Sequence, residues 1–223
     1  MSCFSIESIL IGRLRRRSFC LYSFYSILIF DQNDDMTATT LFDLIERLTS
    51  LMRIWNRQHP LLAELQPIQV SALIYLSRCN RYSDTPLAVT EYLGLTKGTV
   101  SQSLKALEAR GLIEKVADAR DRRSVHLRLS AAAQALVAAI NPPEFLLTAV
   151  EQMGERAQVL EAAFADLLLQ IQRSQDVPGF GLCRICRFHQ QRDGRPFCGL
   201  TQEPLAPNEA ELICREHRPL ETA

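Results

Sequence analysis

Residues 96–130 carry the pattern that most constrains the fold. In this stretch, apolar residues repeat at helical spacing and are then followed by a strict alternation of apolar and polar residues. Thr96 can cap the start of a helix, and Gly111 can end it. Between them, apolar side chains recur at helical spacing: Val100, Leu104 and Leu107. Residues 125–130 then alternate between apolar and polar side chains after a charged turn, which is typical of a β-hairpin. The stretch therefore predicts a helix followed by a hairpin.

The opposite face of this predicted helix carries short hydrogen-bonding side chains and cations. They are Lys97, Thr99, Ser101, Gln102 and Lys105. Such side chains can approach base edges and phosphates closely. Residues 97–128 hold eight cations and four anions, 8 − 4 = +4, in a chain whose formal net charge is zero. The positive charge is local, so we expect a nucleic-acid patch.

A second, shorter helix is expected just before the first one. Pro86 suits its first turn, and Gly94 and Leu95 form a turn at its end. Two helices joined by a short glycine-containing turn and followed by a hairpin make a winged helix-turn-helix module.

The run from Thr96 to Leu129 resembles the core of the MarR family of winged helix-turn-helix transcription regulators. The resemblance rests on two segments, T-K-G-T-V-S-Q-S-L-K-A-L-E-A-R-G-L-I-E-K and D-A-R-D-R-R-S-V-H-L-R-L-S. It implies a homodimer on a pseudo-palindromic DNA operator, with recognition helix 96–110 in the major groove and wing 118–124 in the minor groove. The wing residues implied to bind DNA are Arg120, Asp121, Arg122 and Arg123. The resemblance also implies that Asp121 holds Arg123 and that one of the two last arginines probes the minor groove.

Residues 1–35 differ in character from the rest. Four arginines between positions 13 and 17 precede an apolar stretch from Phe19 to Phe30. This order resembles a secretory signal, but the stretch is too short for a membrane span of about 20 residues, and no small-residue cleavage site follows. We expect Met36 to be the true start and residues 1–35 to be a non-native or disordered extension; a membrane-anchored regulator is the alternative. The expected location is the cytoplasm, without a membrane partner.

Two amphipathic segments predict how the chain assembles. Thr39 or Thr40 can cap a helix over residues 40–58, and residues 144–173 keep a helical period for about eight turns. A helix of that length has more apolar surface than one winged domain can cover, so we expect a homodimer. Residues 36–175 then form the DNA-binding and dimerisation domain.

Four of the seven cysteines lie in a tail over residues 180–219. They are Cys183, Cys186, Cys198 and Cys214, and the alternate ligands are His189 and His217. A reducing cytoplasm disfavours disulfides, so this clustering predicts a metal site. Four thiolates suit Zn²⁺ or an iron–sulfur cluster. Because the first pair alone forms a Cys-x2-Cys knuckle, we favour a cluster slightly. Nearby arginines would offset thiolate charge: Arg184, Arg187, Arg192, Arg195 and Arg215.

The expected fold class is mainly α with a small β-hairpin wing: a winged helix-turn-helix domain, long dimerisation helices and a small cysteine-rich module. The expected function is a sequence-specific repressor that a metal or iron–sulfur site in the tail switches. The alternative is a small-molecule-responsive repressor with a structural zinc tail, and an iron–sulfur enzyme or electron carrier is a third option. We find no phosphate loop, nucleophile elbow or HExxH motif, so no enzyme is expected. Cys79 and Trp55 are interpreted as packing residues.

Overall fold

The computed structural model describes residues 37–118, 121, 124–175 and 177–220. The chain divides into two units, residues 1–60 and 61–223. In the first unit, residues 37–58 are helical. Thr39 and Thr40 lie inside this helix, so the prediction that one of them caps it was wrong. Near its end, the rings of Trp55 and His59 stand 4.8 Å apart. The expectation about Met36 and the segment before it lies outside the described residues.

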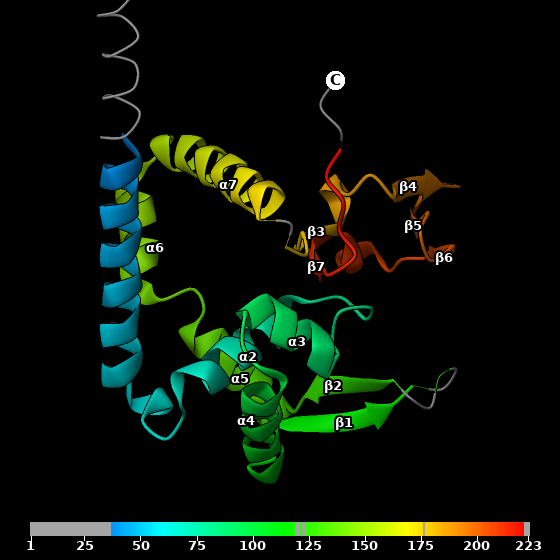
Figure 1. The fold of residues 1–223 in the computed structure, drawn as a ribbon, viewed down its shortest axis with the longest axis horizontal. Helices are drawn as coiled ribbons and strands as arrows, with labels where there is room; N and C mark the ends of the chain where they lie inside the picture. Colours follow the sequence, from blue (N-terminus) through cyan, green and yellow to red (C-terminus); the bar gives the residue numbers. More distant parts are fainter. Residues whose placement is uncertain (1–36, 119–120, 122–123, 176, 221–223) are drawn as a thin grey trace, which may run out of the picture. The chain divides into compact units, whose positions relative to one another are not determined.

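The second unit begins with a winged-helix arrangement (Figure 1). The 3-10 turn η1 (Pro60–Leu62) spans the division between the two units. The elements that follow are α2 (Pro67–Arg78), α3 (Pro86–Leu93), α4 (Lys97–Ala109), β1 (Ile113–Ala117), β2 (Val125–Leu129) and α5 (Ala131–Ile140). The predicted helix-turn-helix corresponds to α3 and α4, and the predicted hairpin to β1 and β2. The predicted winged-helix elements are therefore confirmed.

Local chemistry explains where these helices begin and end. Pro86 occupies the first turn of α3, where its missing N–H costs nothing. The Thr96 hydroxyl accepts a hydrogen bond from the Thr99 amide and caps α4. Gly94 and Gly111 follow α3 and α4 with φ angles of 62° and 66°, a conformation that glycine adopts without a Cβ clash. Ser130 caps α5 in the same way as Thr96 caps α4.

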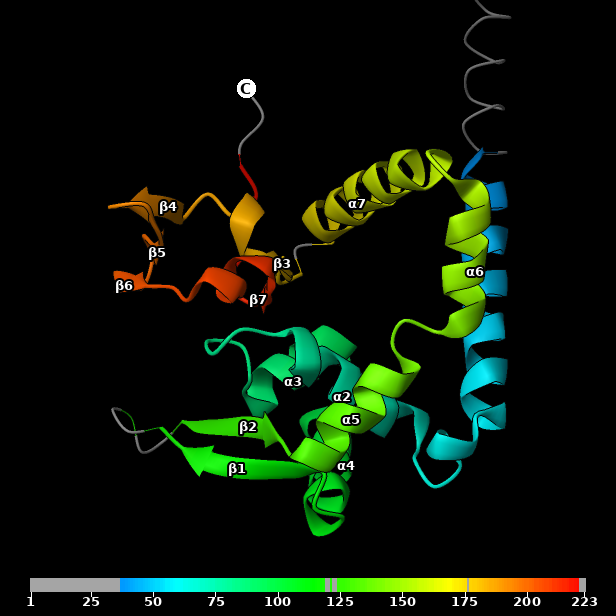
Figure 2. The same ribbon diagram turned by 180° about the vertical axis from the view of Figure 1, so that it is seen from behind.

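The hairpin pairs β1 with β2 in antiparallel register, from Ile113 opposite Leu129 to Ala117 opposite Val125. Figure 2 shows the hairpin extending away from α5. Ile113 and Leu127 are buried at its base. This burial fixes which face of the hairpin meets the helices, because side chains alternate between the two faces of a strand.

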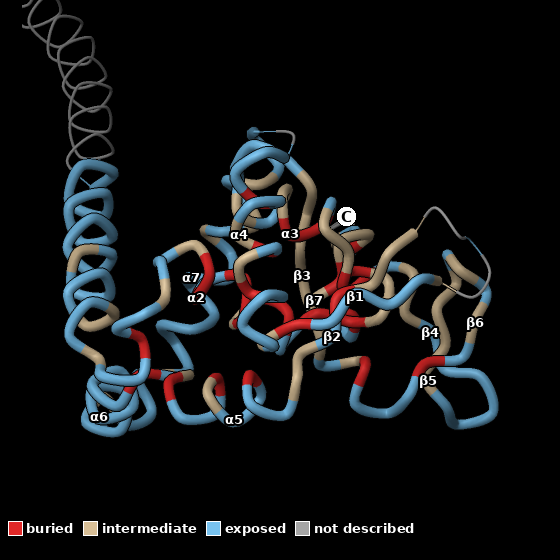
Figure 3. The backbone as a smooth tube through the Cα atoms, turned by 90° about the horizontal axis from the view of Figure 1, so that it is seen from below, coloured by how far each residue is buried: buried red, intermediate tan, exposed pale blue. Residues whose placement is uncertain are grey.

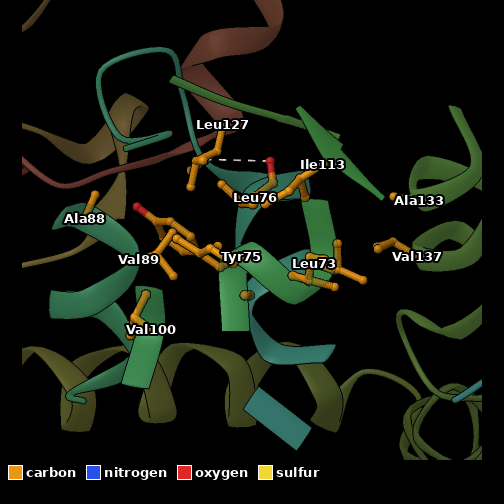
Figure 4. Packing of buried hydrophobic residues seen from close by; sticks show 14 residues of the cluster. Leu73, Tyr75, Leu76, Ala88, Val89, Val100, Ile113, Leu127, Ala133 and Val137 are labelled. Atoms are coloured by element: carbon orange, nitrogen blue, oxygen red, sulfur yellow. Dashed lines mark hydrogen bonds between the residues drawn. The ribbon is translucent and has the colours of Figure 1, made fainter. Parts of the chain in front are cut away.

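The core lies where α2, α3, α4 and α5 meet the hairpin (Figure 4). Leu73, Val89 and Leu107 are fully buried there. Tyr75 is also buried, and its hydroxyl donates to the Ser83 carbonyl at 2.8 Å. Each fully buried aliphatic side chain contributes about 1.5–3 kcal/mol. The winged helix is therefore stabilised mainly by apolar burial.

The single long helix predicted over residues 144–173 is wrong. The structure shows two helices, α6 (Glu144–Met153) and α7 (Arg156–Ser174). Gly154 separates them with φ 56° and ψ −132°, which is not a helical conformation. The apolar period is retained across the break, which is why the pattern did not reveal it. Neither helix buries a residue.

The tail consists of short elements. They are β3 (Gly181–Leu182), η2 (Cys183–Ile185), β4 (His189–Arg192), β5 (Arg195–Cys198), β6 (Glu203–Pro204), η3 (Pro207–Glu211) and β7 (Ile213–Cys214). Strand β3 pairs with β7, and β4, β5 and β6 form a second antiparallel sheet. In Figure 3, buried backbone concentrates in the winged helix and around β3 and β7.

Within the described residues, no single helix is both long and apolar enough to cross a membrane. The pair α5 and α6 meets that criterion only when taken together, and the two helices are bent by 43° relative to each other.

Candidate nucleic-acid interface and cysteine cavity

Helix α4 divides into a buried and an exposed face, as its sequence predicts. Val100, Leu104 and Leu107 are 0–2% exposed and pack into the core. The five predicted DNA-contacting residues of α4 are all exposed: Lys97, Thr99, Ser101, Gln102 and Lys105. Among the described residues, the side chains of Ser101, Gln102 and Lys105 make no hydrogen bond, so they can bind an external partner. The Thr99 hydroxyl already lies 2.9 Å from the Thr96 hydroxyl oxygen.

The wing loop is described at Asp118, Asp121 and Ser124. The Asp121 amide donates to a carboxylate oxygen of Asp118 at 2.7 Å, and the Ser124 hydroxyl donates to Asp121 at 2.9 Å. These bonds set the turn, so Asp121 has a structural role. The predicted contact between Asp121 and Arg123 lies outside the described residues. So do Arg120 and Arg122.

A histidine on the wing joins it to the loop between α2 and α3. His126 contacts the Asp84 carboxylate through Nδ1, and its Nε2 lies 2.9 Å from a carboxylate oxygen of Asp118. The Leu127 amide also donates to the Asp84 carbonyl at 2.7 Å. The hydrogen bonds with Asp84 and Asp118 raise the pKa of His126. Burial raises the pKa of Asp84, although His126 opposes that rise.

Sequence reasoning missed this link. Asp84 precedes a helix-opening proline and is typical of a turn, and His126 occupies an outward position in the alternation. A separation of 42 residues between them leaves no local pattern that could pair them.

The same loop also holds the tail. Arg81 donates to Glu209 at 3.1 Å and to the Pro204 carbonyl at 2.8 Å, and it lies 3.4 Å from Glu203. The Tyr82 hydroxyl donates to Glu203 at 2.8 Å. Charged hydrogen bonds are stronger than neutral ones, particularly where a carboxylate such as that of Glu209 is largely buried.

Further contacts bind the tail to the winged helix. Arg215 forms a two-pronged ion pair with Glu91 of α3, and this pairing lowers the pKa of Glu91. The Arg215 amide donates to the Ser83 hydroxyl at 2.8 Å. Phe180 places its ring edge-on against Tyr92, with ring centroids 5.2 Å apart. The tail therefore packs on α3 and the α2–α3 loop, which the sequence did not predict.

All four predicted thiol ligands line one small cavity. Its lining includes Cys183, Cys186, Cys198 and Cys214, together with His189. Strand pairing explains this convergence, because β3 and β7 place Cys183 near Cys214, and His189 pairs with Cys198. Among the described residues, no group of three or more His, Cys, Asp or Glu side chains is arranged so that it could hold a metal ion. The thiols therefore share a cavity without forming a closed site.

The thiols interact electrostatically. Burial raises the pKa of Cys183 to about 12, with further contributions from the charges of Cys214, Cys186 and Cys198. The Arg218 amide donates to the Cys186 sulfur at 3.5 Å, and His189 Nδ1 lies 3.7 Å from the Cys183 sulfur. These contacts place the four sulfurs in one electrostatic environment.

His217 lies apart from the other candidates and does not line the cavity. The residue is 4% exposed, and its ring packs against Gly181, where a Cβ would come within 2.8 Å of the ring. Burial lowers the pKa of His217. Its position indicates that it packs beneath the start of the tail.

None of the five arginines near the cysteines lines the cavity within the described structure. Arg184 pairs with Glu211 at 2.9 Å, and Arg192 lies 3.6 Å above the Phe197 ring. Arg215 pairs with α3, as described above. Arg184 and Arg192 therefore make contacts within the tail, and Arg215 helps to dock it.

Helices α3 and α4 and the β1–β2 hairpin define a winged helix-turn-helix domain, a class that places its second helix in the major groove of DNA. Residues 63–124 match the model of the MarR family. The match covers less than half of the chain and spans α2 to the wing loop.

Similar solved structures include two complexes with DNA. Staphylococcus aureus MepR with DNA shares 26% identity over 58% of this chain and 96% of that chain, with a TM-score of 0.48. Streptococcus pneumoniae FabT with DNA shares 24% identity over 61% and 98% of the two chains, with a TM-score of 0.45. No curated protein matches the chain at a significant level.

Proposed function

We propose that this protein is a sequence-specific DNA-binding transcription regulator that reads DNA with the exposed face of α4. The observation that carries the proposal is the division of this helix. One face is locked into the core, while Ser101, Gln102 and Lys105 project hydrogen-bonding groups that no described residue uses. Amide and cationic side chains at a helix surface can recognise base edges and phosphates. The match of residues 63–124 to the MarR family supports the same function.

The wing would supply a second DNA contact. Its strands are held to the winged-helix core by Leu127 and to the α2–α3 loop by the His126–Asp84 pair. A wing anchored in this way can present its loop at a fixed distance from α4. We infer that loop residues 118–124 enter the minor groove beside the site that α4 reads.

We propose a homodimer, with α6 and α7 contributing to the dimer interface. No residue of either helix is buried, and large apolar side chains stand exposed along both: Phe145, Leu146, Leu147, Val150, Val159, Leu160, Phe164, Leu168 and Ile171. An exposed apolar surface of this kind usually marks an interface. A second copy of this chain is the simplest occupant, because a two-fold dimer matches a pseudo-palindromic operator.

Repression is the proposed output, since occupation of an operator is sufficient for it. We further propose that the tail provides the regulatory input, because it contacts both α3 and the loop that holds the wing. The expected location of such a regulator is the cytoplasm.

A cavity of about 530 Å³ favours a second candidate, a repressor that responds to a small molecule. Its lining includes Leu76 of α2, Arg128 of β2 and Gln134 of α5. The volume lies in the range of ligand sites. Operator release by a small molecule, with the same sensitivity in zinc-loaded and chelated protein, would favour this candidate.

The test of DNA reading is binding of the full chain to DNA from upstream of its own gene. Gln102→Ala is expected to lower the preference for that DNA over unrelated DNA by about 1–3 kcal/mol. Gln175→Ala is the matched control, because Gln175 is exposed and lies outside both the winged helix and α7. Equal preferences for the wild type and Gln102→Ala, or no preference in the wild type, would contradict the proposal.

A further inference from the structure

We propose that the four tail thiols bind one divalent cation of the zinc class, which fastens the tail to the α2–α3 loop. The thiols come from three separate parts of the tail and meet at one cavity. Cys183 begins η2 and Cys186 follows it, Cys198 ends β5, and Cys214 ends β7. Three of the four, Cys183, Cys186 and Cys214, are 5–8% exposed, and all are free thiols. Tetrahedral coordination by four thiolates is a common form of structural zinc site.

The size of the cavity favours a single ion over an iron–sulfur cluster. Its volume is about 20 Å³, a little above the ~10–15 Å³ that a cavity needs to hold one water molecule. A [4Fe–4S] core contains eight atoms and would have to widen the cavity. A single ion would require the four thiols to approach one centre more closely than they do in the open arrangement described above.

The charges of the four thiolates also favour a bound divalent cation. Four thiols must lose their protons to act as ligands, and the resulting thiolates would repel one another in a cavity that no arginine lines within the described residues. A bound divalent cation offsets that repulsion, and binding releases the protons. The Arg218 amide, which donates to the Cys186 sulfur, would further stabilise a thiolate.

Because the tail has only a small apolar core, a bound ion would stabilise its fold. Leu205 is the one buried tail residue with an aliphatic side chain among those described. The tail strands are two to four residues long. Elements this short are marginal alone, and a bound metal supplies folding free energy directly.

The cavity wall also includes Asn80 and Tyr82 of the α2–α3 loop. The side-chain oxygen of Asn80 accepts a hydrogen bond from the Ser83 hydroxyl at 2.8 Å, and the backbone N–H of Asn80 donates to the Ile213 carbonyl at 2.9 Å. The same loop continues to Asp84, which holds His126 on the wing. Metal binding would therefore order the loop that positions the wing, a consequence that rests on the proposed DNA-binding function.

The test is metal content and Co²⁺ spectroscopy on the full chain, with Cys198→Ser and Cys79→Ser as the matched pair. Cys198 lines the cavity and is the most exposed of the four ligands, whereas Cys79 is buried at the end of α2 and does not line it. The wild type and Cys79→Ser are expected to bind one Zn²⁺ per chain and to give the visible bands of tetrahedral thiolate-bound Co²⁺. Cys198→Ser is expected to bind Zn²⁺ more than about 10-fold more weakly.

Iron with stoichiometric sulfide, Zn²⁺ binding unaffected by Cys198→Ser, or no stoichiometric metal would overturn the proposal. Should Cys198→Ser fail to fold, chelation of the wild type replaces it, and hydrogen exchange is then expected to rise in residues 181–214 before it rises in α2. Unchanged exchange after zinc removal would also overturn it. Operator binding is measured on the same samples. If no zinc site is found but the protein still binds its operator, the metal proposal fails while the proposed DNA-binding function is unaffected.

Discussion

The winged helix and the tail are held together by different kinds of interaction. In the winged helix, side chains such as Leu73, Val89 and Leu107 are fully excluded from water. In the tail, the main contacts are ion pairs, charged hydrogen bonds and a cavity of thiols. Apolar burial dominates in the winged helix, whereas the tail depends on a partner surface and, in our proposal, on a metal. We therefore expect that the tail can detach without unfolding the winged helix.

The largest expected effect comes from damaging the apolar core. Leu107→Ala is expected to lower the free energy of unfolding by about 2–5 kcal/mol, because Leu107 is fully buried and its truncation leaves a cavity. Leu61→Ala is the control, since Leu61 is 56% exposed, and its effect should stay within about 0.5 kcal/mol. Denaturant unfolding measures both. Equal effects would contradict the assignment of the core.

The next effect concerns docking of the tail. Arg81→Ala removes the contacts with Glu203 and Glu209 and leaves the largely buried Glu209 carboxylate without this cation. We expect docking to weaken by about 1–2 kcal/mol, seen as faster hydrogen exchange in β6 and η3 with little change in α2. Arg184→Ala breaks the exposed pair with Glu211 and should cost about 0–1 kcal/mol. If hydrogen exchange became faster to the same extent throughout the second unit, the tail and the winged helix would not open independently, which would contradict the comparison.

The smallest effect concerns pH and the wing. The pKa of His126 is raised by Asp84 and Asp118, so the charged imidazole stabilises the wing fully below its ordinary pKa of about 6.5. This contribution is lost as the pH rises through the raised value. Nuclear magnetic resonance should show His126 titrating above its ordinary pKa, with β2 amides exchanging faster at higher pH beyond the intrinsic pH dependence. Asp84→Asn should move the His126 pKa downward; an unchanged titration would refute the pairing.

The winged helix could be predicted because its determinants are local. Thr96, Val100 and Gly111 act within a few residues of their place in the chain, and the alternation around Leu127 directly indicates a strand. The break at Gly154 was missed because the apolar repeat continues across it. The contacts of Arg81 with Glu209 and of Asp84 with His126 join residues far apart in sequence, so no local pattern reveals them.

The ligand set of the tail could be predicted only in part, for a related reason. The spacing of Cys183 and Cys186 indicated a knuckle, and the structure places Cys198 and Cys214 at the same cavity. His217 shares the spacing of a ligand but packs against Gly181 instead. The direction in which a side chain points depends on how the strands pair, and the spacing of residues in the sequence does not reveal that pairing.

The most direct test of the central claim is the salt dependence of operator binding by the wild type, Lys105→Ala and Arg78→Ala. Lys105 is exposed on α4, while Arg78 is exposed at the end of α2. If α4 lies on DNA, Lys105→Ala should reduce the slope of log affinity against log salt by about one unit. Arg78→Ala should leave the slope unchanged. A wild-type slope for Lys105→Ala, with unaltered affinity, would contradict the claim that this face binds DNA.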